Sequence, residues 1–171
     1  ADLTNIEAVV GAPDRLNMLA DDIIAHYEER QYVLTGKAMI VCMTRRIAIN
    51  LYKLILKKRP DWNKKVKVVL TDSNKDPVEW HDIIGNKAYR DSLMVEFKNI
   101  DSDFKIAIVV DMWLTGFDVP SMATMYIDKP MKGHTLMQAI ARVNRVYKDK
   151  EAGLIVDYIG MAAELKAALN Q

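Results

Sequence analysis

Two kinds of hydrophobic pattern alternate along this chain. In five places the residues are apolar almost without interruption over a few positions, which is typical of strands buried on both faces of a parallel sheet. These stretches are 38–42, 66–70, 106–110, 123–127 and 154–156, of which 123–127 is the weakest. Elsewhere apolar residues recur three and four positions apart, as they do on one face of a helix. This second pattern covers 13–30, 47–55, 89–97 and 136–143.

Strands that alternate with helices predict βαβ units, and therefore an α/β fold in which a parallel sheet lies between two layers of helices. No internal repeat or low-complexity linker divides the chain. We therefore predict one α/β domain over residues 31–160, preceded by a linker and helix at 1–30. Residues 161–171 are expected to begin a further helical segment, because a new helical pattern starts near Met161.

The composition is that of an ordinary globular domain, with 50% hydrophobic and 27% charged residues in a chain of 171 and a net charge of +1. No apolar run approaches the roughly 20 residues that cross a bilayer. The first residues also lack the basic flank and apolar core of a signal peptide. Cys42 is the only cysteine, so an internal disulfide is impossible and a reducing compartment is the default. We expect a cytoplasmic protein without membrane contact.

Positive charge is unevenly distributed, although the net charge is small. Residues 51–67 contain seven cations and one acid. Such a stretch fits a solvated helix end and loop, and it also fits a surface that faces nucleic-acid phosphates. Trp62 and Trp80, which flank the next loop, are equally open to two interpretations, packing in the core or stacking on bases.

Three loops follow predicted strands, at the sheet edge where α/β proteins bind their ligands. They are 43–45, 71–76 and 111–120. Hydroxyl groups and a guanidinium in these loops are suited to phosphate contacts. The residues that carry these groups are Thr44, Arg45, Thr71 and Thr115.

The third loop has the most distinctive sequence. Its strand ends in Asp111, and the loop then places a threonine, a glycine and an aspartate before Pro120. Gly116 would let the backbone approach a phosphate. Asp118 could accept a hydrogen bond from a ribose hydroxyl or pair with a cation. The same residues would also form an ordinary tight turn, so the loop alone does not decide between the two interpretations.

The predicted helix after residue 135 has two distinct faces. Leu136, Ile140 and Val143 share one face, while Gln138, Arg142 and Arg145 share another at the same spacing. Exposed arginines on a helix are often simply solvated. A ligand with several phosphates, however, needs convergent donors, which guanidinium groups supply in a fixed planar fork.

Taken together, these segments resemble the second RecA-like lobe of superfamily 2 helicases and translocases. Residues 138–145 resemble motif VI, with Ala141 where the superfamily has glycine, residues 115–118 resemble motif V, and residues 40–45 resemble motif IV. The similarity is closer to the motor (restriction) subunit of type I restriction enzymes. Four segments of this chain resemble signature sequences of that subunit, namely 37–46, 114–120, 138–145 and 153–160. The resemblance spans roughly residues 14–160.

The resemblance implies a RecA-like fold of the P-loop NTPase type and a role in an ATP-dependent DNA translocase. In that family ATP and Mg²⁺ lie between two RecA-like lobes, and the first lobe, outside this chain, supplies the phosphate loop and the magnesium ligands. The partners implied are double-stranded DNA, the first lobe of the same subunit, and the modification and specificity subunits of a prokaryotic complex. The residue roles implied are catalytic for Arg142 and Arg145, ATP-binding for Gly116, Asp118 and Gln138, and DNA-binding for Thr44, Arg45, Thr71 and Thr115.

Other chemistries find little support in the sequence. A phosphate loop, Gly-x-x-x-x-Gly-Lys-Ser/Thr, is absent, so we expect no ATP hydrolysis from this chain alone. Asp61, Glu96 and Lys98 mimic the residues of a restriction nuclease, but the last two fall in a helical pattern and cannot converge from neighbouring strands. The three histidines are far apart and lack metal-ligand spacing, so no metal site is expected.

Two alternative functions remain open at this point. The chain could be the second lobe of a different superfamily 2 DNA or RNA helicase. It could also be a non-enzymatic, flavodoxin-like binding module. The sequences of residues 114–120 and 138–142 argue against a different superfamily 2 helicase. A flavodoxin-like binding module would have no use for the paired arginines.

Overall fold

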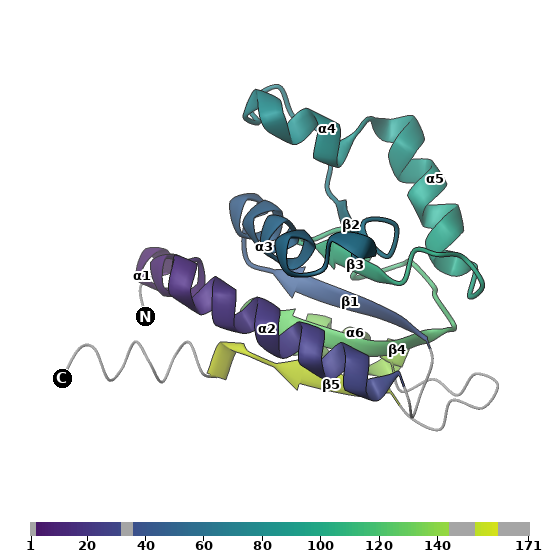
Figure 1. Cartoon of the computed structure of the whole chain (residues 1–171). Helices are drawn as coiled ribbons and strands as arrows, with labels where there is room; N and C mark the ends of the chain where they lie inside the picture. The colour runs from purple at the N-terminus through teal and green to yellow at the C-terminus, as the bar shows by residue number, and fades with distance from the viewer. Residues whose placement is uncertain (1–2, 32–35, 144–152, 161–171) are drawn as a thin grey trace.

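The computed structural model describes residues 3–31, 36–143 and 153–160 (Figure 1). Five parallel strands form one sheet in the order β2-β3-β1-β4-β5. The strands are β1 Lys37–Cys42, β2 Val66–Val69, β3 Ile106–Val109, β4 Met122–Asp128 and β5 Leu154–Asp157. The α-helices are α1 Leu3–Val10, α2 Pro13–Arg30, α3 Arg45–Lys58, α4 His81–Ile84, α5 Lys87–Lys98 and α6 Gly133–Val143, with short 3₁₀ turns η1 at Pro60–Trp62 and η2 at Val78–Trp80.

Helices cover both faces of the sheet, so the molecule has three layers. One core cluster joins the apolar sides of α2 and α3 to alternate residues of β1, namely Ala38, Ile40 and Cys42. The intervening residues Met39 and Val41 face the other cluster, which contains residues of α5 and α6. All six residues of β1 are buried, as expected for a central parallel strand. The predicted three-layer parallel α/β fold is confirmed.

The predicted elements are found with small shifts at their ends. Each of the five apolar stretches is a strand, and each of the four helical patterns contains a helix. The starts of two helices follow from local chemistry, because Thr44 and Asn86 accept hydrogen bonds from the backbone N–H of Ile47 and Tyr89, three residues on. The helical segment expected from Met161 onward lies outside the described residues.

The amino-terminal helix α2 is held to the sheet by a network of buried polar contacts. Arg15 pairs with Asp128 at the end of β4, with two N–O distances of 2.5 and 3.0 Å, and the Asp128 side chain is fully buried. The same guanidinium donates to the backbone carbonyls of Val10 and Tyr158. The Tyr158 hydroxyl in turn donates to Asp22. This network joins residues of α2 to chain positions more than a hundred residues later.

Several side chains whose role was open in the sequence are buried in the core. Trp62 and Trp80 are 4% and 5% exposed, so the packing interpretation is confirmed for both. Lys65 lies 4.9 Å from the centre of the Trp62 ring, and Arg46 lies 5.1 Å from that of Trp80. Burial raises the pKa of the Cys42 thiol, as expected for an inert core residue. Among the helices that the structure describes, none is both long and apolar enough to cross a bilayer.

The pairing of Arg15 with Asp128 predicts a large stability effect. Asp128→Ala removes the carboxylate and leaves a mostly buried guanidinium unpaired, so we expect a loss of about 3–5 kcal/mol in the free energy of unfolding. Urea unfolding measures it. Glu28→Ala is the matched control, because the Arg59–Glu28 pair, at 2.9 Å, is exposed on both sides and should contribute less than about 1 kcal/mol. Equal losses in the two variants would contradict the prediction.

Candidate functional site

Helix α6 carries Arg142 away from the carboxyl edge of the sheet. The helix begins five residues after β4 ends and runs back antiparallel to that strand, because β5, which starts at Leu154, is parallel to β4. Gly153, just before β5, lies so close to the Val143 carbonyl that any Cβ at this position would clash. The last turn of α6 therefore lies beside the start of β5, at the amino end of the sheet.

The loop after β3 also reaches the amino end. It leaves β3 at the carboxyl edge, and the backbone of Ser121 accepts a hydrogen bond of 2.9 Å from the N–H of Lys37 at the start of β1. Residues 110–121 thus cross the whole face of the sheet, whereas the sequence placed this loop at the carboxyl edge with the other two. The difference arises because β4 is parallel to β3, so the chain has to return to the amino end before β4 begins.

Arg142 is hydrogen-bonded to this loop. Its Nη1 donates to the backbone carbonyl of Phe117 and, at 3.4 Å, to that of Trp113. Within the described ranges, the hydrogen bonds of this guanidinium involve Nη1 alone. The same guanidinium carries further N–H donors at Nε and Nη2. Two segments that the sequence singled out separately therefore form one local structure.

The central turn of the loop carries exposed residues. Thr115, Gly116 and Asp118 are exposed, and Gln138 is exposed on α6. Gly116 has a φ of 74°, and a Cβ added there would meet no atom within 4 Å. The glycine is therefore required by its left-handed backbone, and the space in front of its backbone is open. Arg145, the second predicted arginine, lies outside the described residues.

Three of the four residues predicted to bind DNA lie at the carboxyl edge. Thr44 follows β1 and uses its hydroxyl oxygen, at 3.1 Å, to cap α3. Arg45 makes a two-point ion pair with Asp76, with N–O distances of 2.6 and 3.3 Å. Thr71 is exposed after β2. Arg45 is thus already paired with an acid, while Thr115 belongs to the crossing loop.

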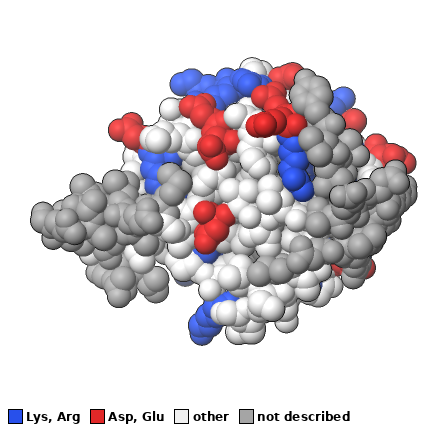
Figure 2. Space-filling view, turned by 90° about the horizontal axis from the view of Figure 1, so that it is seen from below, with Lys and Arg blue, Asp and Glu red and all other residues white. Residues whose placement is uncertain are grey.

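The basic stretch at 51–67 is partly neutralised as well. Lys58 pairs with Asp21 at 2.8 Å, and Arg59 pairs with Glu28. Lys53, Lys57 and Lys64 remain exposed. Figure 2 shows the molecule from below, where the described acidic and basic groups lie near one another and most of the other described surface carries neither charge.

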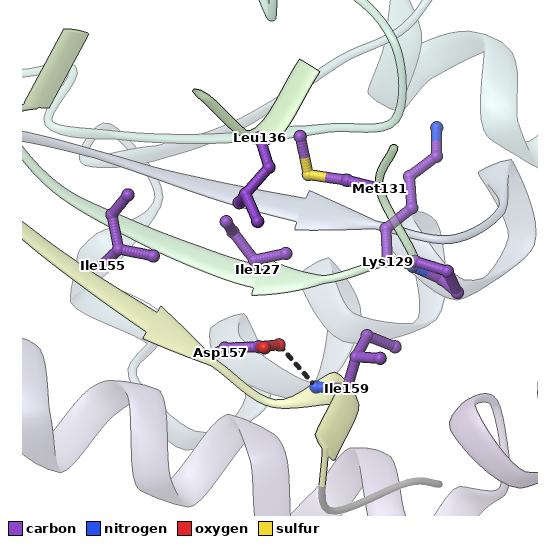
Figure 3. Close-up of a pocket in the computed structure, with 8 residues that line it drawn as sticks. Ile127, Lys129, Met131, Leu136, Ile155, Asp157 and Ile159 are labelled. Atoms are coloured by element: carbon purple, nitrogen blue, oxygen red, sulfur yellow. Dashed lines mark hydrogen bonds between the residues drawn. The ribbon is translucent and has the colours of Figure 1, made fainter. Parts of the chain in front are cut away.

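An apolar cavity of about 580 Å³ opens between β4, β5 and the start of α6. Figure 3 shows Ile127, Leu136 and Ile155 on its wall, with Asp157 below Ile127 and Lys129 to the right. Asp157 accepts a hydrogen bond of 2.9 Å from the backbone of Ile159. No predicted site residue lines this cavity. In the part of the chain that the structure describes, no group of three or more His, Cys, Asp or Glu side chains could hold a metal ion.

Sequence reasoning missed the aromatic cluster in which the crossing loop is buried. Trp113 and Phe117 are buried in the crossing loop, and Phe97 and Phe104 pack with them. Lys37 is fully buried beside Phe97, and burial lowers its pKa to about 8. The large apolar residues inside a loop of otherwise polar character were the available signal.

The backbone of Gly116 allows a direct test. Gly116→Ala places a side chain on a left-handed residue, so we expect a loss of about 1–2 kcal/mol in the free energy of unfolding, although nothing blocks the added methyl group. Gly116→Asn should lose less, because asparagine tolerates this conformation. Gly133→Ala is the control, since that position is equally open and has no positive φ. Chemical denaturation compares them, and a stable Gly116→Ala protein would refute the assignment.

Comparison with known proteins places this geometry in a family. Residues 57–160 match the family model described as type I restriction enzyme subunit R domain 3. The chain is also 49% identical over 166 residues to the putative type I restriction enzyme MjaIXP endonuclease subunit of Methanocaldococcus jannaschii. That match covers 97% of this chain and 16% of the relative, so the chain spans about a sixth of the length of that protein.

Solved structures show the same fold at low sequence identity. A fragment of a putative HsdR subunit of a type I restriction enzyme from Vibrio vulnificus YJ016 matches with a TM-score of 0.68 and 17% identity, covering 98% of this chain and 30% of that one. The ATP-dependent Type ISP restriction-modification enzyme LlaBIII, solved bound to DNA, matches with a TM-score of 0.50 and 15% identity over 71% of this chain and 8% of that one. The sheet and its flanking helices therefore form a RecA-like domain. The chain belongs to the type I restriction enzyme subunit R family and is the carboxyl-terminal RecA-like lobe of that subunit's helicase-like region.

Proposed function

We propose that this lobe supplies the nucleotide-contacting arginines and part of the DNA-phosphate surface of an ATP-dependent DNA translocase. The observation that carries the proposal is the hydrogen bonding of Arg142 to the loop that contains Gly116. It unites a guanidinium with an open, glycine-containing backbone segment. In the complete subunit the partners would be the first RecA-like lobe, double-stranded DNA, and the modification and specificity subunits.

The residues at the amino end of the sheet fit a nucleotide held against a second lobe. The open backbone at Gly116 leaves room for a phosphate or ribose, and Nε and Nη2 of Arg142 can donate to phosphate oxygens. Negative charge develops on the γ-phosphate oxygens as the terminal bond breaks, and guanidinium groups aimed there stabilise the transition state more than the ground state. Mg²⁺ would be held by the first lobe.

The residues at the carboxyl edge fit contacts to DNA phosphates. Thr44 and Arg45 follow β1, and Thr71 follows β2, which ends at the same edge with β3 between the two strands. Phosphate contacts of this kind fix position without reading sequence. To bind DNA, the Arg45 guanidinium would have to leave the Asp76 carboxylate for a phosphate, or bind both groups at once. The ATP-dependent LlaBIII enzyme, which was solved bound to DNA, supports this assignment by analogy of fold.

The arginine assignment predicts a specific kinetic defect. In the complete subunit with saturating DNA, Arg145→Ala should lower ATP turnover on the order of 10³-fold, because transition-state stabilisation is lost. ATP binding and the melting temperature should change much less, and Arg145→Lys should restore little, since an ammonium group lacks the planar fork. Steady-state ATPase assays, nucleotide titration and a thermal melt provide the measurements. Arg59→Ala, which alters an exposed arginine at the end of α3, is the control, and normal turnover in Arg145→Ala would remove this residue from the active site.

The DNA assignment predicts a change in salt dependence. Arg45→Ala in the complete subunit should weaken DNA binding to a similar extent for all sequences, because phosphate contacts carry no code. The slope of the logarithm of the DNA-binding constant against the logarithm of the salt concentration should become less steep by about 0.9, the contribution of one phosphate contact. Binding titrations over a range of salt concentrations test this, again beside Arg59→Ala. An unchanged slope, or a loss confined to one DNA sequence, would count against the contact.

A further inference from the structure

Trp113 has an unusual backbone. Its φ is 68°, and it is the one non-glycine residue with a positive φ among the residues that the structure describes. A bulky side chain is strained in this left-handed conformation. Strained residues persist where their surroundings impose the conformation, and they concentrate at functional sites. Trp113 lies three residues before Gly116, the second left-handed position of the same loop.

The indole of Trp113 is also unsatisfied. The side chain is 6% exposed, and its Nε1 has no hydrogen-bond acceptor among the described residues. Buried polar groups without a partner are rare in folded proteins. Neither the backbone nor the N–H of Trp113 therefore explains why the residue adopts this position. The explanation must come from the contacts of the aromatic ring.

Those contacts connect helix α5 to the crossing loop. The Trp113 ring is stacked on Phe97 of α5 at a centroid distance of 5.4 Å and an interplanar angle of 27°. It lies 4.4 Å from the ring of Phe117. Phe104 packs behind, 4.8 Å from Phe97 and 6.4 Å from Trp113. The indole thus fills the space between a rigid helix and the far end of its own loop.

The backbone at both ends of this contact binds the same arginine. The carbonyls of Trp113 and Phe117 both accept from Nη1 of Arg142. Between these two carbonyls lie the exposed residues Thr115 and Gly116. The ring contact and the arginine therefore both hold the two residues, Trp113 and Phe117, that flank the exposed turn.

We propose that Trp113 is a positioning residue for the nucleotide-facing site. By stacking between Phe97 and Phe117 it fixes the turn at Thr115 and Gly116 and holds the two carbonyls that orient the Arg142 guanidinium. This inference rests on the proposed function of Arg142, and it adds a residue that acts through it without touching the nucleotide. The aromatic surface is the active part of the side chain, since the N–H has no partner to lose among the described residues.

The test compares three variants in the complete subunit with saturating DNA. Trp113→Leu should lower kcat for ATP about ten-fold or more, with KM for ATP changed less than about three-fold, because the arginine is misaligned while ground-state binding survives. Trp113→Phe should retain kcat within about three-fold, since a ring remains to stack. Phe104→Leu removes an aromatic side chain from the same cluster without touching Arg142 or the turn, and it should lower the melting temperature but leave kcat within about three-fold.

A double variant separates this proposal from the proposed function. If Trp113 acts through Arg142, Trp113→Leu combined with Arg142→Ala should be no slower than Arg142→Ala alone. Normal turnover in Arg142→Ala would overturn the proposed function and the positioning role together. Slow Arg142→Ala with normal Trp113→Leu would overturn the positioning role alone. That role would also be overturned if Trp113→Leu and Phe104→Leu lowered kcat equally, or if the two defects multiplied in the double variant.

Discussion

A parallel sheet must be covered on both faces. In this lobe a loop, and not a helix, covers part of one face. Strands β3 and β4 are parallel and separated by β1, so the chain must cross a face of the sheet to join them. In most such connections a helix buries the sheet. Here residues 110–121 do so as a loop, and Trp113, Leu114, Phe117 and Val119 are buried in it. The fold and the candidate site depend on this one crossing.

The crossing separates the residues of the loop by function. Its apolar side chains enter the core with Phe97 and Phe104, while Thr115, Gly116 and Asp118 remain at the surface. Arg142 then binds the backbone carbonyls that the buried residues hold in place. Polar chemistry at the surface is thus positioned by close packing beneath it, which keeps a small exposed turn in a single conformation. A loop that also serves as core cannot shift without disturbing the sheet.

Much of the fold could be predicted from the sequence, because strand burial and helix faces leave periodic patterns. The five strands and the helix of residues 136–143 were found in this way. Contacts between distant residues leave no such pattern. The pairing of Arg15 with Asp128 and of Arg45 with Asp76 depends on the tertiary fold, and each changes what the arginine can do.

The residues of the candidate site remain a prediction, and their arrangement was not predicted. Gly116 and Arg142 were selected separately, one for backbone freedom and one for its guanidinium, and the structure joins them. The strained backbone of Trp113 has no sequence signal, because tryptophan rarely adopts a left-handed conformation. Thr44 and Arg45 were correctly placed at the carboxyl edge, whereas the crossing loop leaves that edge because it has to reach the start of β4.

The central claim is that the turn at Gly116 and the end of α6 together face the nucleotide. The most direct measurement is a structure of the complete subunit with a non-hydrolysable ATP analogue and DNA. We expect Nε or Nη2 of Arg142 to lie within hydrogen-bonding distance of a phosphate oxygen, with the Gly116 backbone beside the nucleotide and the Phe117 contact preserved. A nucleotide bound between the lobes with Arg142 turned away, or seated at the carboxyl edge near Thr44, would contradict it.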